Sequence, residues 1–165
     1  YFSYFERNVA GTNGGAIGWN KGANNGLVEN SIFTNNTANR SGGAIYWNGH
    51  NGTIRNSNFT HNRALGIANA TDAFDNVTYG GDGGAVIWIG SEGDVINSRF
   101  IDNVAAKRGG AVYLQGTKLE NASNTHFYFS YFERNVAGTN GGAIDWNKGA
   151  QNGIISNCTF ESNVA

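Results

Sequence analysis

The fold is decided by the stretch Phe5-Glu6-Arg7-Asn8-Val9-Ala10 followed by Gly14-Gly15-Ala16-Ile17. Both parts of this stretch return along the chain, as Phe-x-x-Asn-x-Ala and as Gly-Gly-Ala-Ile/Val. The first motif begins at Phe5, Phe33, Phe59, Phe100, Phe132 and Phe160. The second motif begins at Gly14, Gly42, Gly83, Gly109 and Gly141. Two motifs that return together at this frequency indicate one structural unit built several times.

The composition narrows the class of protein. The chain has 165 residues, 25 Gly, no Pro, one Cys and 14% charged residues, with a net charge of -1. This charge gives no electrostatic reason to expect nucleic acid as a partner, and no apolar run approaches the ~20 residues of a membrane-spanning helix. The 13% of aromatic residues predict a folded chain. Because Met is absent, we expect a processed piece of a longer protein.

The spacing of the repeat points to a solenoid. Successive Phe residues of the motif are separated by 28, 26, 41, 32 and 28 residues, and periods of roughly 20–50 residues are typical of solenoids, propellers and arrays. Paired Gly and β-branched residues disfavour helices, while a propeller blade needs about 40 residues. We predict an all-β, parallel β-helix over residues 1–165, with one 26–28-residue repeat per coil and five to six coils.

Each coil is expected to contain two strands with stacked inward side chains. One strand is Gly-Gly-Ala-Ile/Val with the two residues after it, and the other is exemplified by residues 28–33. Cys158 takes a small inward position that is Ser in other repeats, so we interpret it as a packing residue. The expected inward ladders are Phe5, Phe33, Phe59, Phe100, Phe132 and Phe160, and Trp19, Trp47, Trp88 and Trp146.

A third ladder is expected at the bend of the coil. The Asn of Phe-x-x-Asn tolerates turn conformations, and its amide can bond to the coils above and below. Its copies are Asn8, Asn36, Asn62, Asn103, Asn135 and Asn163.

One outward column carries aromatic residues. It contains Tyr46, Ile87 and Tyr113 on three adjacent coils, between Gly18 and Asp145. An exposed aromatic row can stack on sugar rings or pack against another rod. The alternative is that the insertion loop at residues 63–82 covers the column.

Two segments interrupt the repeat, at residues 63–82 and 116–126. Insertions in solenoids become loops on one face, and such loops often bind ligands. The larger loop is apolar, and its Phe74 and Tyr79 are further candidate binding residues. We hypothesise that this loop folds over an outward patch of Ile87, Ile96 and Ile101; the rival is a lateral contact with another protein. Its other apolar residues are Leu65, Ile67 and Val77.

The pattern of acidic residues does not favour catalysis. Glycan-degrading β-helices need several carboxylates in one groove, but only Glu133 and Glu161 stack on adjacent coils and Asp145 stands alone. We therefore predict no catalytic residue, no cofactor and no metal site. The loop carboxylates Asp72, Asp75 and Asp82 match no calcium loop, and His50, His61 and His126 lack the spacing of metal ligands.

Eight Asn-x-Ser/Thr sequons occur in the chain. Those on the expected loops, Asn69, Asn76 and Asn121, are the candidate N-glycosylation sites. Asn157 is expected to be engaged in the ladder at the coil bend.

The repeated Gly-Gly-Ala-Ile/Val and Phe-x-x-Asn motifs resemble the repeat of the chlamydial polymorphic outer-membrane proteins. The longer form in residues 56–64 is similar to the adhesin-like surface proteins of methanogenic archaea. The resemblance implies a right-handed parallel β-helix in a large, secreted surface protein associated with adhesion. It implies no catalytic residues and no particular ligand.

A longer repeat is superimposed on the short one. Residues 1–17 recur unchanged at 128–144, and residues 1–38 agree with 128–165 at 28 of 38 positions. The offset of 127 residues spans four coils, so residues 1–127 form a super-repeat that restarts at 128. We expect a structural and adhesive cell-surface module that forms a rod or filament by self-association, head-to-tail or lateral. Cell-surface glycans or other cells are its expected partners. The alternative is a carbohydrate-binding or glycan-degrading domain.

Overall fold

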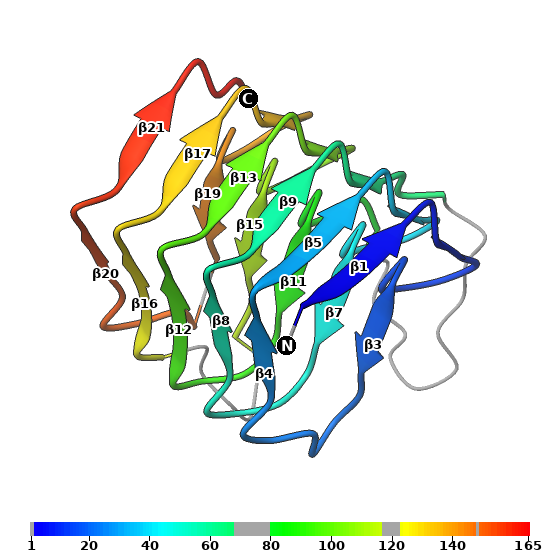
Figure 1. Cartoon of the computed structure of the whole chain (residues 1–165). Helices are drawn as coiled ribbons and strands as arrows, with labels where there is room; N and C mark the ends of the chain where they lie inside the picture. Colours follow the sequence, from blue (N-terminus) through cyan, green and yellow to red (C-terminus); the bar gives the residue numbers. More distant parts are fainter. Residues whose placement is uncertain (1, 68–79, 117–122, 148) are drawn as a thin grey trace.

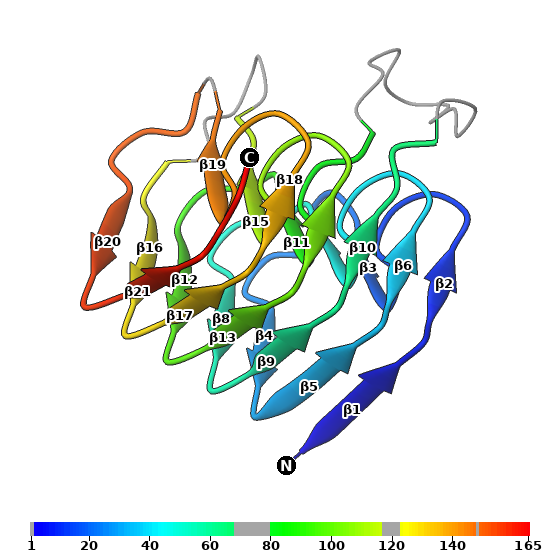
Figure 2. The same cartoon turned by 90° about the horizontal axis from the view of Figure 1, so that it is seen from above.

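The computed structural model describes residues 2–67, 80–116, 123–147 and 149–165. These residues form β-strands and no helix, and all strand pairs are parallel. The strands form four sheets, A to D, which are stacked along one axis as a β-solenoid (Figures 1 and 2). The predicted fold class is confirmed.

Each coil contributes one strand to each sheet in the order A, B, C, D. Coils 1 to 5 span residues 3–29, 31–55, 58–96, 99–128 and 131–156, and β21 begins a sixth coil. Sheet A contains β1 (Ser3–Glu6), β5 (Ser31–Thr34), β9 (Asn58–Thr60), β13 (Arg99–Ile101), β17 (Tyr131–Glu133) and β21 (Thr159–Glu161). Sheet B contains β2 (Val9–Ala10), β6 (Thr37–Ala38), β10 (Arg63–Ala64), β14 (Val104–Ala105) and β18 (Val136–Ala137).

The Gly-Gly-Ala-Ile/Val motif leads into sheet C. Sheet C contains β3 (Ile17–Trp19), β7 (Ile45–Trp47), β11 (Val86–Trp88), β15 (Val112–Leu114) and β19 (Ile144–Trp146). Sheet D contains β4 (Leu27–Glu29), β8 (Thr53–Arg55), β12 (Gly93–Ile96), β16 (Thr125–Tyr128) and β20 (Ile154–Ser156).

The prediction of one strand over residues 28–33 is wrong, because the chain turns a corner at Asn30. The φ of Asn30 is 49°, in the left-handed region that Asn tolerates better than most residues. The strand is thereby divided into β4 and β5, which belong to different sheets. The same corner recurs in every later coil. It lies at Asn56, Asn97, Phe129 and Asn157.

The bend after sheet A lies one residue earlier than expected. The left-handed residue is the one before the motif Asn, for example Asn35 with φ 55° and Asp102 with φ 54°. The motif Asn itself points inward and forms the ladder. The Oδ1 of Asn103 accepts from the backbone N–H and the side-chain amide of Asn62, at 3.0 and 2.9 Å. The Asn103 amide in turn donates to the Phe59 carbonyl at 2.9 Å.

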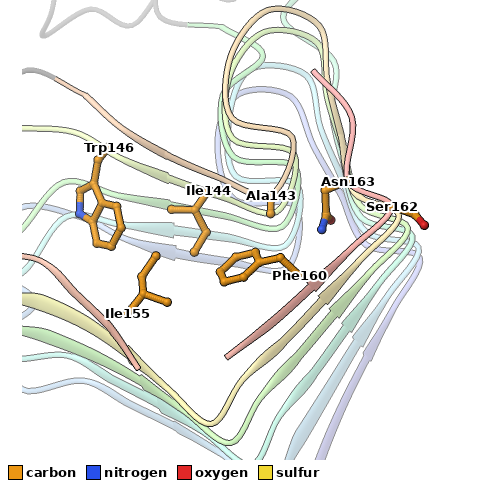
Figure 3. A pocket seen from close by; sticks show the side chains of 7 residues that line it. All are labelled: Ala143, Ile144, Trp146, Ile155, Phe160, Ser162 and Asn163. Carbon is orange, nitrogen blue, oxygen red and sulfur yellow. The ribbon is translucent and has the colours of Figure 1, made fainter. Parts of the chain in front are cut away.

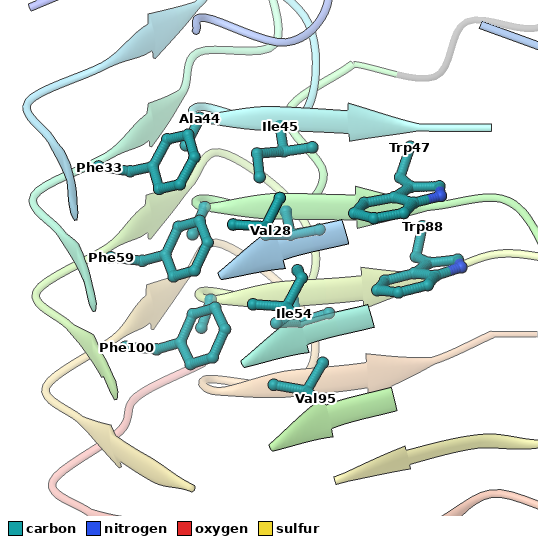
Figure 4. Close-up of a cluster of buried hydrophobic side chains, with 14 of the residues drawn as sticks. Val28, Phe33, Ala44, Ile45, Trp47, Ile54, Phe59, Trp88, Val95 and Phe100 are labelled. Carbon is teal, nitrogen blue, oxygen red and sulfur yellow. The ribbon is translucent and has the colours of Figure 1, made fainter. Parts of the chain in front are cut away.

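The core consists of stacked side chains from all coils (Figure 4). Ring centroids of successive motif Phe residues are 4.5–4.9 Å apart, with interplanar angles of 2–5°. Trp47 and Trp88 stack at 4.6 Å on the opposite side of the core, and both are fully buried. Burial of each such aromatic side chain stabilises the fold by about 1.5–3 kcal/mol.

A second polar ladder runs beside the Phe stack. The hydroxyl of Ser57 accepts from the Ser31 backbone N–H at 3.1 Å and donates to the Arg55 carbonyl at 2.9 Å. Ser98 and Ser130 repeat this arrangement. Cys158 continues the ladder, since its Sγ lies 3.4 Å from the Ser130 backbone nitrogen.

Candidate functional site

The predicted aromatic column lies on the outer side of sheet C. Tyr46, Ile87, Tyr113 and Asp145 are neighbours in register on β7, β11, β15 and β19. Ile87 and Tyr113 are nevertheless buried, with exposed fractions of 1% and 0%, and Tyr46 is half-buried. Ile87 and Tyr113 are therefore covered, and the row offers no continuous open aromatic surface. Residues 68–79, most of the loop that was expected to cover it, lie outside the described part of the chain.

The connections between sheets B and C contribute to this cover. Gly42 lies so close to Ile87 that a Cβ at residue 42 would approach the Ile87 Cγ2 to 2.9 Å. The guanidinium of Arg108 lies over the Tyr113 ring, 4.4 Å from its centroid. Asp82 holds that guanidinium with two hydrogen bonds of 2.8 and 2.9 Å.

Burial and neighbouring charges together shift the pKa values of Tyr113, Arg108 and Asp145. Burial raises the pKa of Tyr113 to about 12, although the nearby Arg108 charge opposes the shift. Burial acts to lower the pKa of Arg108, but the hydrogen bond and charge of Asp82 outweigh it, and the net shift is upward. Burial raises the pKa of Asp145, with Arg108 opposing and Asp82 adding to the shift. Asp145 is the only carboxylate in its own column, as predicted, but the charges of Arg108 and Asp82 act on it from outside the column.

Asp82, Arg108 and Tyr113 form a structural cluster. Asp82 is fully buried and its carboxylate is engaged by Arg108. The Tyr113 hydroxyl accepts a hydrogen bond from the Asn147 amide. Because the polar groups of Asp82 and Tyr113 already have partners, the cluster resembles a satisfied internal network more than a ligand site.

The expected apolar patch is not a single surface. Ile87 belongs to sheet C, Ile96 to sheet D and Ile101 to sheet A, so the three side chains face different sides of the solenoid. Ile87 is buried, while Ile96 and Ile101 are half-buried. The left-handed corner at Glu92 separates Ile87 from Ile96, and the one at Asn97 separates Ile96 from Ile101.

Several predicted residues lie outside the described part of the chain. These are the loop residues Phe74, Val77 and Tyr79, the carboxylates Asp72 and Asp75, and the sequon residues Asn69, Asn76 and Asn121. Leu65 and Ile67, at the start of the larger loop, are 38% and 47% exposed. Asn157 is not part of the Asn ladder, since it is an exposed corner residue whose amide donates to the Ser156 hydroxyl.

The two ends of the solenoid expose apolar core positions. In coil 1 the inward ladder residues Phe5 and Trp19 are only partly buried, and beyond coil 5 Phe160 is 43% exposed. Figure 3 shows the second end, where Ile144, Trp146 and Ile155 lie around an open hollow together with Phe160. The same ladder positions are fully buried in the central coils.

A polar hollow that was not predicted lies on the outer side of sheet D. Strand pairing places Asp94 beside His126, whose Nδ1 lies 3.0 Å from the Asp94 Oδ1. Glu92, Asn51 and Asn124 contribute to the same hollow. The hollow could have been found from the register of β12 with β16, which places Asp94 next to His126. This register could not be predicted, because residues 116–126 interrupt the repeat.

The predicted pair of stacked carboxylates lies on sheet A. Glu133 and Glu161 are neighbours in register, and Glu161 accepts from the Tyr131 hydroxyl at 2.8 Å. Within residues 2–67, 80–116, 123–147 and 149–165, no three His, Cys, Asp or Glu residues are grouped so as to hold a metal ion. Nor does this part of the chain form a helix long and apolar enough to cross a membrane.

Two stretches of the chain are similar to a repeat of a known protein family. The model of the Chlamydia polymorphic membrane protein repeat matches residues 30–46 and 97–115. No curated protein and no solved structure matches the chain. Each matched stretch runs from a corner before sheet A, through sheet B, into sheet C. The two matches and the solenoid together fit a β-helix repeat of the polymorphic membrane protein type.

Proposed function

We propose that this chain is a structural and adhesive module of a cell-surface protein, whose coils stack end to end into a rod. The repeat model that matches two stretches of the chain describes a membrane protein of Chlamydia, which supports a place at the cell surface. An all-parallel solenoid supports the rod, because each coil pairs only with its two neighbours.

The packing of coil 5 on coil 4 carries the proposal. Coil 5 begins the second copy of the super-repeat, since residues 128–144 are identical to residues 1–17. Phe132 of this copy stacks on Phe100 at 4.9 Å, close to the 4.8 Å between Phe59 and Phe100 within the first copy. The strand pairing continues unchanged from coil 4 into coil 5, which supports the stacking of successive super-repeats.

The open ends support further stacking. A solenoid end leaves unpaired strand edges and exposed core residues, which another coil can cover. At coil 1 the ladder residues Phe5 and Trp19 are only partly buried, and beyond coil 5 Phe160 is exposed. The covering coil can belong to the same long chain or to a second copy, and both arrangements build a rod.

The rod is tested by its length. Proteins containing one, two and three copies of residues 1–127 should differ in length by roughly 19 Å per copy, since four coils rise by about 4.8 Å each. Small-angle X-ray scattering measures this length, and electron microscopy shows the particle shape. Compact particles whose longest dimension does not grow with copy number would contradict the proposal.

Self-association and adhesion need separate measurements. Sedimentation velocity of the 165-residue chain should show concentration-dependent, end-to-end species, and replacement of Phe160 by Asp should remove them if coil 6 takes part in the contact. For adhesion, beads coated with the three-copy protein should bind cells more than beads coated with an unrelated solenoid. Equal binding by both beads would reject the adhesive part and leave the rod intact.

A further inference from the structure

A polar hollow crosses three coils at the corner between sheets C and D. Its volume is about 380 Å³, which lies within the size range of small-ligand sites. The side chains that line it come in pairs from successive coils. They are Asn51 and Thr53 of coil 2, Glu92 and Asp94 of coil 3, and Asn124 and His126 of coil 4.

The hollow is a departure from the repeat. The outward position that starts sheet D is Leu27 in coil 1 and Ile154 in coil 5, and both are about half exposed. In the three coils between them the same position is Thr53, Asp94 and His126. Polar side chains thus replace apolar ones only in the part of the super-repeat that forms the hollow.

The corner residue of coil 3 departs from its column in the same way. Asn occupies this left-handed corner in the other four coils, whereas coil 3 has Glu92 with φ 60°. A Glu residue is less suited to this conformation than Asn, so the corner itself gives no reason for the change. The change does add a second carboxylate to the hollow, beside that of Asp94.

The Asp94–His126 pair sets the hydrogen-bonding character of the hollow. The Nδ1 of His126 lies 3.0 Å from the Asp94 Oδ1, and the two side chains are 25% and 44% exposed. In the neutral imidazole, donation from Nδ1 to the carboxylate leaves Nε2 as an acceptor. The Asn51 and Asn124 amides and the Thr53 hydroxyl supply donors as well as acceptors.

An aromatic ring borders these polar groups. Tyr128 is two residues after His126 on the outward face of β16, and their ring centroids are 5.7 Å apart. Its neighbour in register on coil 3 is Ile96, which also faces outward and is half-buried. The face of an aromatic ring can pack against the C–H groups of a sugar ring, while its edge remains in water.

We propose that this hollow binds neutral sugar residues of a glycan. Sugar hydroxyls both donate and accept hydrogen bonds, which fits carboxylates, amides and an imidazole acceptor around one opening. Glu92 and Asp94 make the site acidic, and Arg55 on the same sheet is paired with Glu29 at 2.8 Å. Like charges disfavour acidic sugars. The site does not depend on rod formation, since all of its residues lie in coils 2 to 4.

Nuclear magnetic resonance of the ¹⁵N-labelled 165-residue chain tests the proposal. The probes are four neutral trisaccharides (cellotriose, maltotriose, mannotriose and chitotriose) and acidic trigalacturonate. At least one neutral probe should shift the amide signals of Glu92, Asp94 and Asn124 in a saturable way, while signals of Leu27 and Ile154 remain unchanged. Trigalacturonate should bind at least tenfold more weakly than that probe.

Matched variants assign the contacts. Asp94→Asn, His126→Ala and Tyr128→Ala should each weaken binding at least tenfold, whereas Leu27→Ala and Ile154→Ala, at outward positions beyond the hollow, should leave it unchanged. Unaltered signals from the stacked Trp residues would show that each variant is folded. No shift with any neutral probe at about 10 mM, where even millimolar affinity saturates the site, would overturn the proposal. The same shifts with CaCl₂ alone would replace it by a cation site.

Discussion

Gly52 lies directly against the indole ring of Trp47, so closely that a Cβ at residue 52 would be 2.3 Å from the Trp47 Cζ2. Gly93 has the same relationship to Trp88, and Gly153 to Trp146. Coil 4 is the exception, because Leu114 takes the Trp position and Thr125 takes the Gly position. A large residue on sheet C and a residue without a side chain at the entry to sheet D thus form a matched pair.

This pairing predicts the effect of Gly52→Ala. The added methyl group must displace the Trp47 ring, which is fixed between Trp19 and Trp88, so we expect a loss of about 1–3 kcal/mol in the free energy of unfolding. Chemical denaturation followed by Trp fluorescence measures it. The control is Gly18→Ala, where the new Cβ meets nothing within 4 Å. If both variants are equally stable, the close packing of Gly52 and Trp47 is not what requires glycine.

Coil 4 allows the pairing to be tested by exchange. Leu114→Trp alone should destabilise the protein, because the indole would meet the buried side chain of Thr125. Adding Thr125→Gly should recover most of this loss. A double-mutant cycle on the free energies of unfolding gives the coupling, which we expect to exceed about 0.5 kcal/mol. Additive effects of the two substitutions would show that these positions do not depend on each other.

The Asn ladder predicts a graded series along the solenoid. Asn103→Ala removes the acceptor for the buried Asn62 backbone N–H and the donor to the Phe59 carbonyl. We expect this variant to lose about 2–4 kcal/mol of stability, since each buried group left without a partner costs about 1–3 kcal/mol. Asn8→Ala, at the exposed end of the ladder, should lose less than about 1 kcal/mol. Equal losses measured by urea unfolding would contradict a ladder that depends on burial.

Two ion pairs of similar geometry should contribute very differently to the free energy of unfolding. Arg108 binds Asp82, whose side chain is fully buried, whereas Arg134 binds Asp102 with 50% of the Arg side chain exposed. Arg108→Ala should cost about 3–5 kcal/mol, because it leaves a buried carboxylate without its partner. Arg134→Ala should have a much smaller effect on the free energy of unfolding, because water screens this exposed pair. Thermal unfolding of both variants at low and high salt measures these effects. A loss of stability in Arg134→Ala as large as that in Arg108→Ala would contradict the prediction that burial makes the difference.

Asp145 predicts a pH dependence with a definite sign. Burial raises the pKa of its carboxyl in the folded protein, so the ionised form is less favourable there than in the unfolded chain. This penalty is present above the folded-state pKa, and it disappears as the pH falls toward the unfolded value of about 3.9. Asp145→Asn should therefore be more stable than the wild type at pH 7, with the difference shrinking near pH 4. A constant difference in unfolding free energy between these pH values would exclude protonation as its cause.

The sequence by itself determined the repeating part of the structure. A column of identical residues, such as Phe33 and Phe59, can stack only if successive repeats lie in register at the strand spacing, so periodicity alone predicts the solenoid and its inward ladders. The four-sided coil could not be predicted in the same way. It depends on single left-handed residues such as Asn30 and His61, and a lone Asn or His in a sequence does not show whether the chain turns there.

Tertiary structure alone decided what the outward residues do. Tyr113 and Tyr128 both face away from the core, but Arg108 and the neighbouring chain bury the first, while the second borders a hollow on another side. Asp94 and His126 are 32 residues apart and meet only because β12 pairs with β16. Inward positions repeat because the ladders require it, whereas outward positions are free to vary. The exposure and contacts of an outward residue therefore depend on which coils and corners surround it.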